Sequence, residues 1–207
     1  QQDDIADVAW SPDGTRLHAA AWDGSVSVWA SDSLQLLRVL RDSSARMQQI
    51  ECSPDGRWLA GGDWDSRFWV WDARTLERVH RSDRLGGHVL SLAWSPDSSL
   101  LVVGGKGVVV PLFEATDWEC VGRLVGHAAS VQTLAFTPDG RTLVSGCALG
   151  SVRLWDLTNL DWRTLHRDEG SEPAAGIAFS ADPTRAAVGW RHGEIEIWDT
   201  VARTRDR

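Results

Sequence analysis

Residues 127–156 read HAASVQTLAFTPDGRTLVSGCALGSVRLWD, and variations of this stretch fill the rest of the chain. The stretch completes a Gly-His pair, contains a Thr-Pro-Asp-Gly turn at 137–140 and closes on Trp-Asp at 155–156. The turn recurs as Ser-Pro-Asp-Gly at 11–14 and 53–56, as Ser-Pro-Asp-Ser at 95–98, and in weakened form at 180–183. The four turn prolines are 42 residues apart, so the chain is a tandem repeat of five copies.

Each copy predicts four short strands. In the reference copy, an apolar run at 131–136 leads into the turn, where Pro fixes φ, Asp bonds to nearby backbone and Gly accepts a positive φ. Strands follow at 141–145 and 151–155, and a more polar one at about 161–166. This pattern is typical of a propeller blade. We therefore expect an all-β propeller of five four-stranded antiparallel blades in one domain, 1–207, with blades at about 3–40, 46–83, 88–125, 128–168 and 173–207.

The period, the turn sequence and the closing Trp-Asp together resemble the WD-repeat β-propeller family, in its bacterial-type Ser-Pro-Asp-Gly form. Trp-Asp is intact at 71–72, 155–156 and 198–199, and becomes Trp-Ala at 29–30 and Phe-Glu at 113–114. Related propellers usually have seven blades. The resemblance therefore leaves three interpretations open for five copies: closure as five blades, membership of a larger propeller, or completion by another chain.

The resemblance also implies a structural hydrogen-bonded set in each blade. In the family, a His before the first strand, a Ser or Thr on the second, an Asp in the hairpin and the closing Trp bond to one another, as buried polar groups must. No copy has all four. The matching residues are Asp23 and Trp29 in the first blade, Asp65 and Trp71 in the second, His127, Ser145 and Trp155 in the fourth, and Trp198 in the fifth.

Several tryptophans and one proline carry further expectations. Trp10 and Trp94 end first strands, which is a core position, and Cys52 occupies the same position in the second copy. We expect Trp118, and likewise Trp162, to pack against neighbouring strands. A proline at 111 interrupts the third strand of the third copy, and because it has no N–H we expect locally open pairing there.

Composition excludes several classes of function. The net charge of −8 argues against nucleic-acid binding and against anionic membranes, and no apolar run is long enough to cross a bilayer. The three cysteines fall in strand positions, and no Cys-x-x-Cys or His cluster has metal-ligand spacing, so we expect no metal and no cofactor. The pattern is that of a reduced, cytoplasmic protein. A single lysine among many Arg, Asp and Ala residues resembles bacterial sequences of high GC content.

Strand direction predicts where a partner would bind. The starts of the first strands and the hairpins between second and third strands lie on the same face, and in WD-repeat proteins these positions commonly contact partners. They are Trp22, Trp64, Lys106 and Arg191 in the hairpins, and Asp4, Arg46, Gln48 and His88 at the strand starts. A tight turn does not require an indole. Trp22 and Trp64, with the basic residues around them, therefore predict a site for an extended peptide or loop that carries an acidic or phosphorylated element beside an apolar anchor. The alternative is that each indole merely packs over its own blade.

The leading hypothesis is a non-enzymatic protein–protein interaction scaffold or sensor module, whose partner is a protein or peptide. By analogy with the family, it could be the sensor half of a larger bacterial NTPase or protein kinase. A third reading is a structural propeller that self-assembles through open blade edges. An enzyme is not expected: for a propeller hydrolase, the candidates at the hairpin ring are Asp4, His88 and His192, and they lie on separate blades. Self-association and a larger parent chain both stay open.

Overall fold

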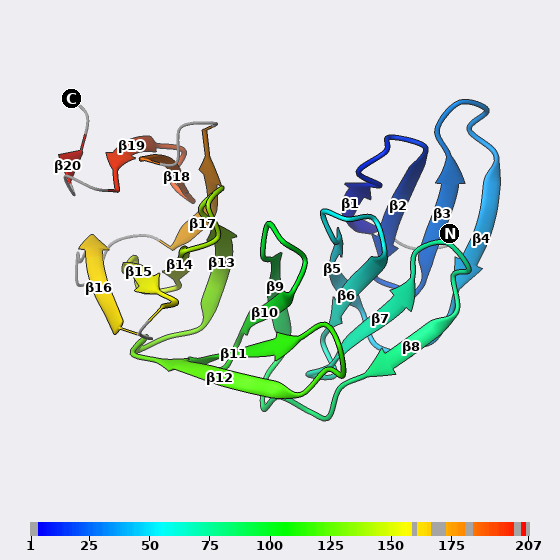
Figure 1. Ribbon diagram of the computed structural model, residues 1–207, viewed down its shortest axis with the longest axis horizontal. Helices are drawn as coiled ribbons and strands as arrows, with labels where there is room; N and C mark the ends of the chain where they lie inside the picture. The colour runs from blue at the N-terminus through cyan, green and yellow to red at the C-terminus, as the bar shows by residue number, and fades with distance from the viewer. Residues whose placement is uncertain (1–3, 159–160, 167–172, 181–183, 201–203, 206–207) are drawn as a thin grey trace.

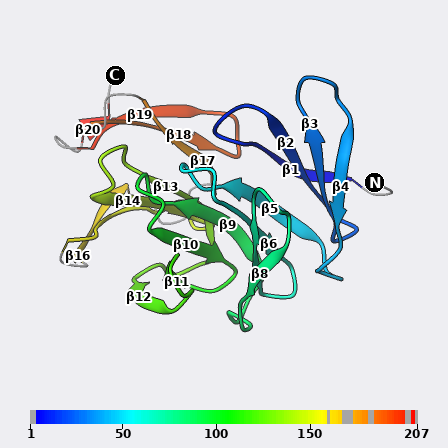
Figure 2. The same cartoon turned by 45° about the vertical axis from the view of Figure 1, so that its right-hand side comes forward.

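The computed structural model describes residues 4–158, 161–166, 173–180, 184–200 and 204–205. Within these ranges all regular structure is strand, in five four-stranded antiparallel sheets built from consecutive strands, which confirms the predicted fold class. Figure 1 shows the five sheets, the blades, side by side in an arc, and Figure 2 shows the same arrangement turned. No helix in the described part is long and apolar enough to cross a membrane.

The strand bounds repeat closely from blade to blade. Blade 1 contains β1 (Ile5–Trp10), β2 (Arg16–Ala21), β3 (Val26–Ala30) and β4 (Leu36–Leu40). Blade 2 contains β5 (Met47–Cys52), β6 (Trp58–Asp63), β7 (Phe68–Asp72) and β8 (Arg78–Arg81). Blade 3 contains β9 (Val89–Trp94), β10 (Leu100–Gly105), β11 (Val109–Glu114) and β12 (Cys120–Val125). Blade 4 contains β13 (Val131–Phe136), β14 (Thr142–Cys147), β15 (Val152–Asp156) and β16 (Asp161–His166). Blade 5 contains β17 (Ala174–Phe179), β18 (Arg185–Trp190), β19 (Ile195–Asp199) and β20 (Thr204–Arg205).

The Pro-Asp turns between first and second strands share one geometry. In blade 1 the N–H of Gly14 donates to the carbonyl of Ser11 at 2.8 Å, with Gly14 at φ 70°. The carboxylate of Asp13 accepts the Ser11 hydroxyl at 2.6 Å and the Thr15 N–H at 3.0 Å, and these bonds lower the pKa of Asp13 to about 2. The sequence Ser-Pro-Asp-Gly thus fixes the turn through side-chain bonds and one positive-φ residue.

The hydrophobic core lies between blades rather than within them. Each inner strand packs against the next one around the arc, from β1 to β5, β9, β13 and β17. Between blades 1 and 2, for example, Val28 packs with Ile50 and Trp71, all of which are at most 2% exposed. Side chains also tie the inner strands together. Asp7 accepts the N–H of Ile50 at 3.0 Å, and Gln49, at the equivalent position one blade later, accepts the N–H of Leu92.

Pro111 opens one sheet, as its missing N–H predicts. Pairing between β10 and β11 runs from Leu100↔Glu114 only as far as Val102↔Leu112. β11 nevertheless pairs with β12 from Val109 to Phe113, and it stays next to β10 (Figure 1).

The two ends of the arc expose faces that other blades bury. Trp10, expected in the core, is 57% exposed, whereas Trp94 at the equivalent position is 4% exposed. The reason is that this position packs against the preceding blade, and no described residues cover it in blade 1. At the other end, Ile195 is 72% exposed although its counterpart Val152 is fully buried against blade 5. In this structure the five blades do not close on one another (Figure 1).

Candidate functional site

One backbone hydrogen bond per blade ties the hairpin to the start of the first strand. In each blade the backbone N–H of a hairpin residue donates to the backbone carbonyl of the strand-start residue at 2.9–3.1 Å. The pairs are Trp22 to Asp4, Trp64 to Arg46, Lys106 to His88, Ala148 to Ser130, and Arg191 to Pro173. Just inside each first strand, the register shifts by one residue, which leaves a bulge at Ala6, Gln48, Leu90, Gln132 and Ala175. Bulges redirect side chains. The hairpin residues and strand starts singled out from the sequence are therefore neighbours on a common face, the hairpin face.

On the hairpin face, four side chains from three blades stack in a row that we call the aromatic–arginine ladder: Trp22, Arg46, Trp64 and His88. The guanidinium carbon of Arg46 lies 4.8 Å from the centre of the Trp22 ring and 5.0 Å from that of Trp64. The other neighbour of Trp64 is His88, with ring centres 4.9 Å apart and planes 18° apart. Gln48 fixes the central indole, because its Oε1 accepts the Trp64 Nε1–H at 2.9 Å. The two tryptophans thus pack across blades, through an arginine between them.

The electrostatics of the ladder favour an anion. The two hairpin carboxylates nearby are engaged: Asp23 lies 3.6 Å from Arg41, and Asp65 accepts two bonds from Arg84 at 2.6 and 2.8 Å. The Arg84 bond is the main cause that lowers the pKa of Asp65. Arg46 is exposed and has no carboxylate partner within the described residues. Its guanidinium lies within 5.0 Å of the centres of both indole rings, and the N–H donors of an exposed guanidinium can bond to a carboxylate or phosphate.

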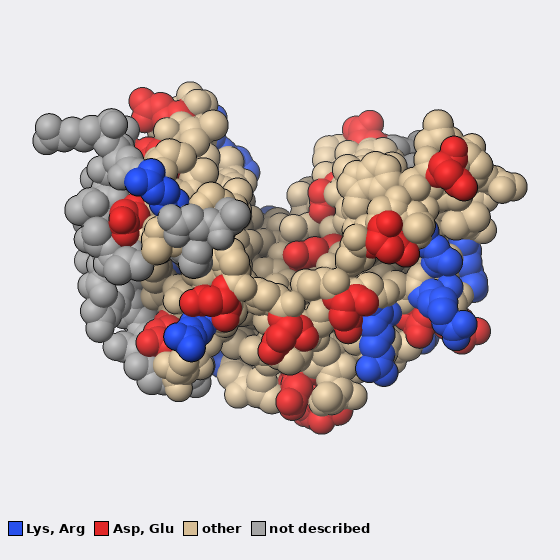
Figure 3. Space-filling model, turned by 45° about the horizontal axis from the view of Figure 1, so that its top comes forward, with Lys and Arg blue, Asp and Glu red and all other residues tan. Residues whose placement is uncertain are grey.

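Of the other residues predicted at the site, some adjoin the ladder and one lies apart from it. Lys106 is exposed and adjoins the ladder through its backbone bond to His88. Asp4 is also exposed and adjoins Trp22 in the same way. Arg191 is exposed on blade 5, and blade 4, which carries Ala148 at this position, separates it from the ladder. Figure 3 shows that Asp and Glu are scattered over the visible side of the molecule, whereas Lys and Arg gather mainly at the right, over blades 1 and 2.

The buried hydrogen-bonded set of blade 4 follows the carried-over residues. The Ser145 hydroxyl lies 2.6 Å from Nε2 of His127 and accepts the Trp155 Nε1–H at 2.7 Å. Leu149 replaces the hairpin aspartate in this blade, and Ser151 lies 3.3 Å from Nδ1 of His127 instead. In blades 1 and 5 the closing indole uses an acceptor two residues away in the sequence: Trp29 donates to Ser27 at 3.0 Å, and Trp198 donates to Glu196 at 3.0 Å.

Blade 2 corrects the expectation for Asp65. The buried carboxylate is that of Asp63, which accepts the Ser43 hydroxyl at 2.7 Å and the Trp69 Nε1–H at 2.8 Å. Trp71 donates instead to Asp42 at 2.8 Å, and Asp65 lies at the surface with Arg84. The shift has a simple cause. Residue 63 is on β6 and its side chain faces the buried surface between blades 1 and 2, whereas residue 65 is at the tip of the hairpin.

Two pairs of side chains, His127 with Ser145 and Cys52 with His18, are of types used in nucleophilic catalysis, but burial shifts their pKa values against that role. Burial lowers the pKa of His127 to about 4, and the Ser145 hydroxyl beside it is enclosed and occupied by an indole N–H. Cys52 lies 3.4 Å from Nδ1 of His18, a contact that the sequence did not reveal. Burial raises the pKa of the Cys52 thiol to about 12 and lowers that of His18 to about 4, so the pair stays neutral. Within the described residues, no cluster of three His, Cys, Asp or Glu side chains could hold a metal.

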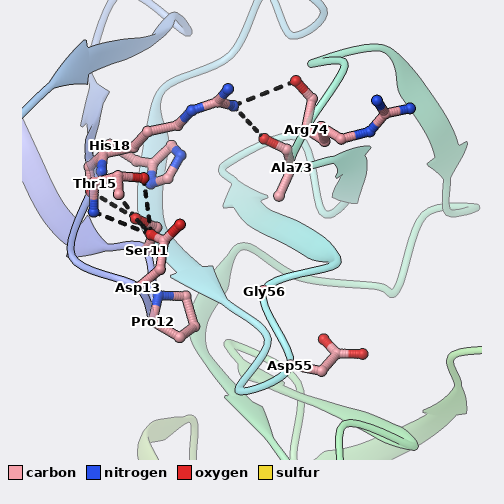
Figure 4. A pocket seen from close by; sticks show the side chains of 10 residues that line it. Ser11, Pro12, Asp13, Thr15, His18, Asp55, Gly56, Ala73 and Arg74 are labelled. Carbon is pink, nitrogen blue, oxygen red and sulfur yellow. Dashed lines mark hydrogen bonds between the residues drawn. The ribbon is translucent and has the colours of Figure 1, made fainter.

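A cavity of 540 Å³ lies between the turns of blades 1 and 2, on the face opposite the hairpins (Figure 4). Two of the charged side chains that line it already have partners, whereas Nε2 of His18 has none among the described residues. Arg16 donates to the carbonyls of Ala73 at 2.5 Å and Arg74 at 3.4 Å, and Asp13 is occupied by its own turn. The hairpin face, where charged donors remain open, is therefore the stronger candidate site.

Comparison with known proteins gives one result. The family model described as "WD domain, G-beta repeat" matches residues 1–30, 34–72, 79–110 and 118–156, which together are more than half of the chain. These segments fall on blades 1 to 4. Blade 5, which both the sequence repeat and the strands of the structure define, lies outside the match. None of the curated proteins gives a significant match to the chain.

Proposed function

Because the chain belongs to the WD-repeat family, whose domains are generally protein-interaction scaffolds, we propose that it is a non-enzymatic scaffold that binds a peptide or protein loop on its hairpin face. The observation that carries this proposal is the aromatic–arginine ladder. Its members come from three blades, so no single repeat needs the stack for its own packing. The bacterial origin and cytoplasmic location suggested by composition stay predictions.

The ladder also suggests the chemistry of the partner. An arginine held between two indoles has already lost much of its side-chain freedom, so an incoming anion need not order it. Trp and Arg are also the residues that most often dominate binding energy at protein interfaces. We expect a segment in which a carboxylate or phosphoryl group bonds to the Arg46 edge while an apolar side chain contacts the half-buried indoles.

The test is a binding measurement on an immobilised peptide array in which Glu or phosphoserine stands at varied spacing from Leu or Phe. For the best peptide, we expect Arg46→Lys, which keeps the charge but loses the planar fork, to weaken binding at least tenfold. The double variant Trp22→Ala, Trp64→Ala should cost more than about 2 kcal/mol, or roughly thirtyfold in Kd. Arg141→Ala, at an exposed arginine of blade 4, is the control. If the folded ladder variants retain the wild-type peptide preference and Kd, the proposal is wrong.

A second candidate function, structural self-assembly, is favoured by the exposed end faces. The β1 face (Ile5, Val8, Trp10) and the β19 face (Ile195, Ile197) are the two halves of an interface that the structure forms four times between consecutive blades. A second copy could bring them together head to tail, and such contacts need not close into a ring. Sedimentation should then show mass that rises with concentration, and Trp10→Ser should lower it. A monomer at all concentrations would refute this candidate.

A further inference from the structure

A groove lies on the outer wall of the molecule, between β8 of blade 2 and β11–β12 of blade 3. Figures 1 and 2 show where these strands run. The volume of the groove is 420 Å³, and we call it the outer groove. The apolar part of its lining comes from Leu85, Val109, Pro111 and Phe113. It contains no residue of the ladder, so its binding properties are independent of the proposed function.

Beside the outer groove, Pro111 interrupts the backbone pairing of blade 3. Pairing between β10 and β11 stops at Val102↔Leu112, whereas the equivalent strands of blade 2 remain paired as far as Gly62↔Phe68. β10 and β11 stay adjacent beyond this point, but their backbone groups are no longer paired there. Next to the short strand β8, the partly exposed apolar side chains that line the groove are Leu85, Val109 and Trp118.

The aromatic wall of the groove is fixed in place. Trp118 stacks on His80 with ring centres 5.6 Å apart, and meets the edge of Trp58 at 5.4 Å. Its backbone has a positive φ of 65°, and the equivalent turn positions Leu34 and Leu76 also have positive φ, of 53° and 60°. Trp118 thus packs against a neighbouring blade, as its sequence predicts, but from the turn before β12 rather than from a strand. The side chain of Trp162 lies outside the described residues.

Charge at the rim of the outer groove favours carboxylates. Three arginines line it: Arg81, Arg84 and Arg123. Arg84 is bound to Asp65, but Arg81 and Arg123 are exposed and have no carboxylate partner within the described residues. Asp83 and Glu119 also line the groove, so the open positive charge is confined to the positions of these two arginines. Such a site is unusual on a protein of net charge −8.

The edge of the sheet suggests the conformation of the ligand. β12 is the last strand of blade 3, so its outer backbone groups have no strand partner. Val121 and Val125 on this strand are 53% and 62% exposed. An extended segment, whose alternate side chains point to opposite sides, could place apolar groups on the aromatic wall and acidic groups at the rim.

We propose that the outer groove binds an extended peptide segment of a partner protein in which carboxylate side chains alternate with an aromatic or aliphatic one. Val109 and Trp118 contact the apolar side chain, and Arg81 and Arg123 bond to the carboxylates. The scaffold would then have two independent sites, one on its hairpin face and one on its wall.

Cys120 allows a direct test, because it lines the groove and is exposed, whereas Cys52 is partly buried and Cys147 is fully buried. The probe is the fluorescein-labelled peptide acetyl-Leu-Asp-Phe-Asp-Leu-amide, and its control replaces both Asp residues by Asn. Polarisation should show saturable binding of the Asp peptide, at least tenfold tighter than that of the Asn peptide. At saturation, the unlabelled Asp peptide should slow alkylation of Cys120 by iodoacetamide at least fivefold.

Variants separate this site from the hairpin face. The double variant Arg81→Glu, Arg123→Glu should weaken binding of the Asp peptide at least tenfold, whereas Arg141→Glu should change it less than twofold. Trp64→Ala should leave it unchanged, since that residue belongs to the ladder. Equal binding of the Asp and Asn peptides, unprotected Cys120, or loss of binding in Trp64→Ala with retention in the arginine variant would each overturn the proposal.

Discussion

Glu51 provides the sharpest test of how burial and charge set the stability of this protein. It occupies an inner-strand position that is alanine in the other four blades, at Ala9, Ala93, Ala135 and Ala178. Part of its side chain reaches the surface, but Oε2 is enclosed without a hydrogen-bond partner. Burial is the main cause that raises the pKa of Glu51 from 4.5 to about 8, and the nearby charge of Asp7 adds to it. We predict that Glu51→Gln stabilises the protein at neutral pH.

The size of the effect follows from proton linkage. The unfolded chain loses the Glu51 proton above pH 4.5, whereas the folded protein keeps it up to about pH 8. Wild-type stability therefore falls as pH rises through this window, by about 1.4 kcal/mol per unit. By pH 7 the loss is roughly 3 kcal/mol, and about 2 kcal/mol after allowing for the partial solvent contact. Glutamine cannot ionise, and its oxygen can still accept the N–H of Trp94 that bonds to Glu51.

The assay is urea unfolding followed by tryptophan fluorescence at several pH values between 4 and 8, at constant ionic strength. The free energies of unfolding of wild type and Glu51→Gln should agree near pH 4 and diverge steadily above it. Glu77→Gln, at an exposed glutamate, should give no such divergence. Parallel curves, or a variant that is less stable at pH 8, would show that Glu51 is solvated or paired and would refute the reasoning.

Three further outcomes are expected. Ser145→Ala leaves the buried indole N–H of Trp155 without an acceptor, and should lower the free energy of unfolding by roughly 2–3 kcal/mol in denaturant titrations. Burial lowers the pKa of His127 from 6.5 to about 4, so between pH 6.5 and 5 wild type should lose roughly 2 kcal/mol more stability than His127→Asn. With a thiol-specific chromogenic reagent at neutral pH, Cys120 should react in the folded protein, whereas Cys52 and Cys147 should react only in urea.

Each of these outcomes has its own control. Ser44→Ala, at an exposed serine, should change the free energy of unfolding by less than about 0.5 kcal/mol. The histidine argument fails if the two pH profiles run parallel below pH 6.5. For the thiols, Cys120→Ser should abolish the fast reaction, and rapid modification of two thiols in the folded protein would contradict the burial described above.

The sequence by itself determined the blades, because every blade repeats the same local chemistry. Ser-Pro-Asp-Gly closes its turn with bonds among neighbouring residues, and period-two alternation specifies strands that need no distant partner to be recognised. The fixed period also located the hairpin face, since equivalent positions in equivalent blades must lie side by side. The effect of Pro111 could be predicted for the same reason, because a residue without an N–H interrupts strand pairing wherever it occurs.

Only the tertiary structure decided what those equivalent positions do. The intercalation of Arg46 between two indoles depends on the spacing of adjacent blades, which no residue pattern specifies. Trp10 and Trp94 occupy the same position in the repeat, yet one is exposed and the other buried, because burial depends on the blade before it. Asp63 rather than Asp65 is the buried carboxylate because enclosure between blades 1 and 2, not position in a motif, fixes which acid must be paired. Local bonds form the blades, whereas contacts between blades determine which side chains are buried, which are exposed and which acids are paired.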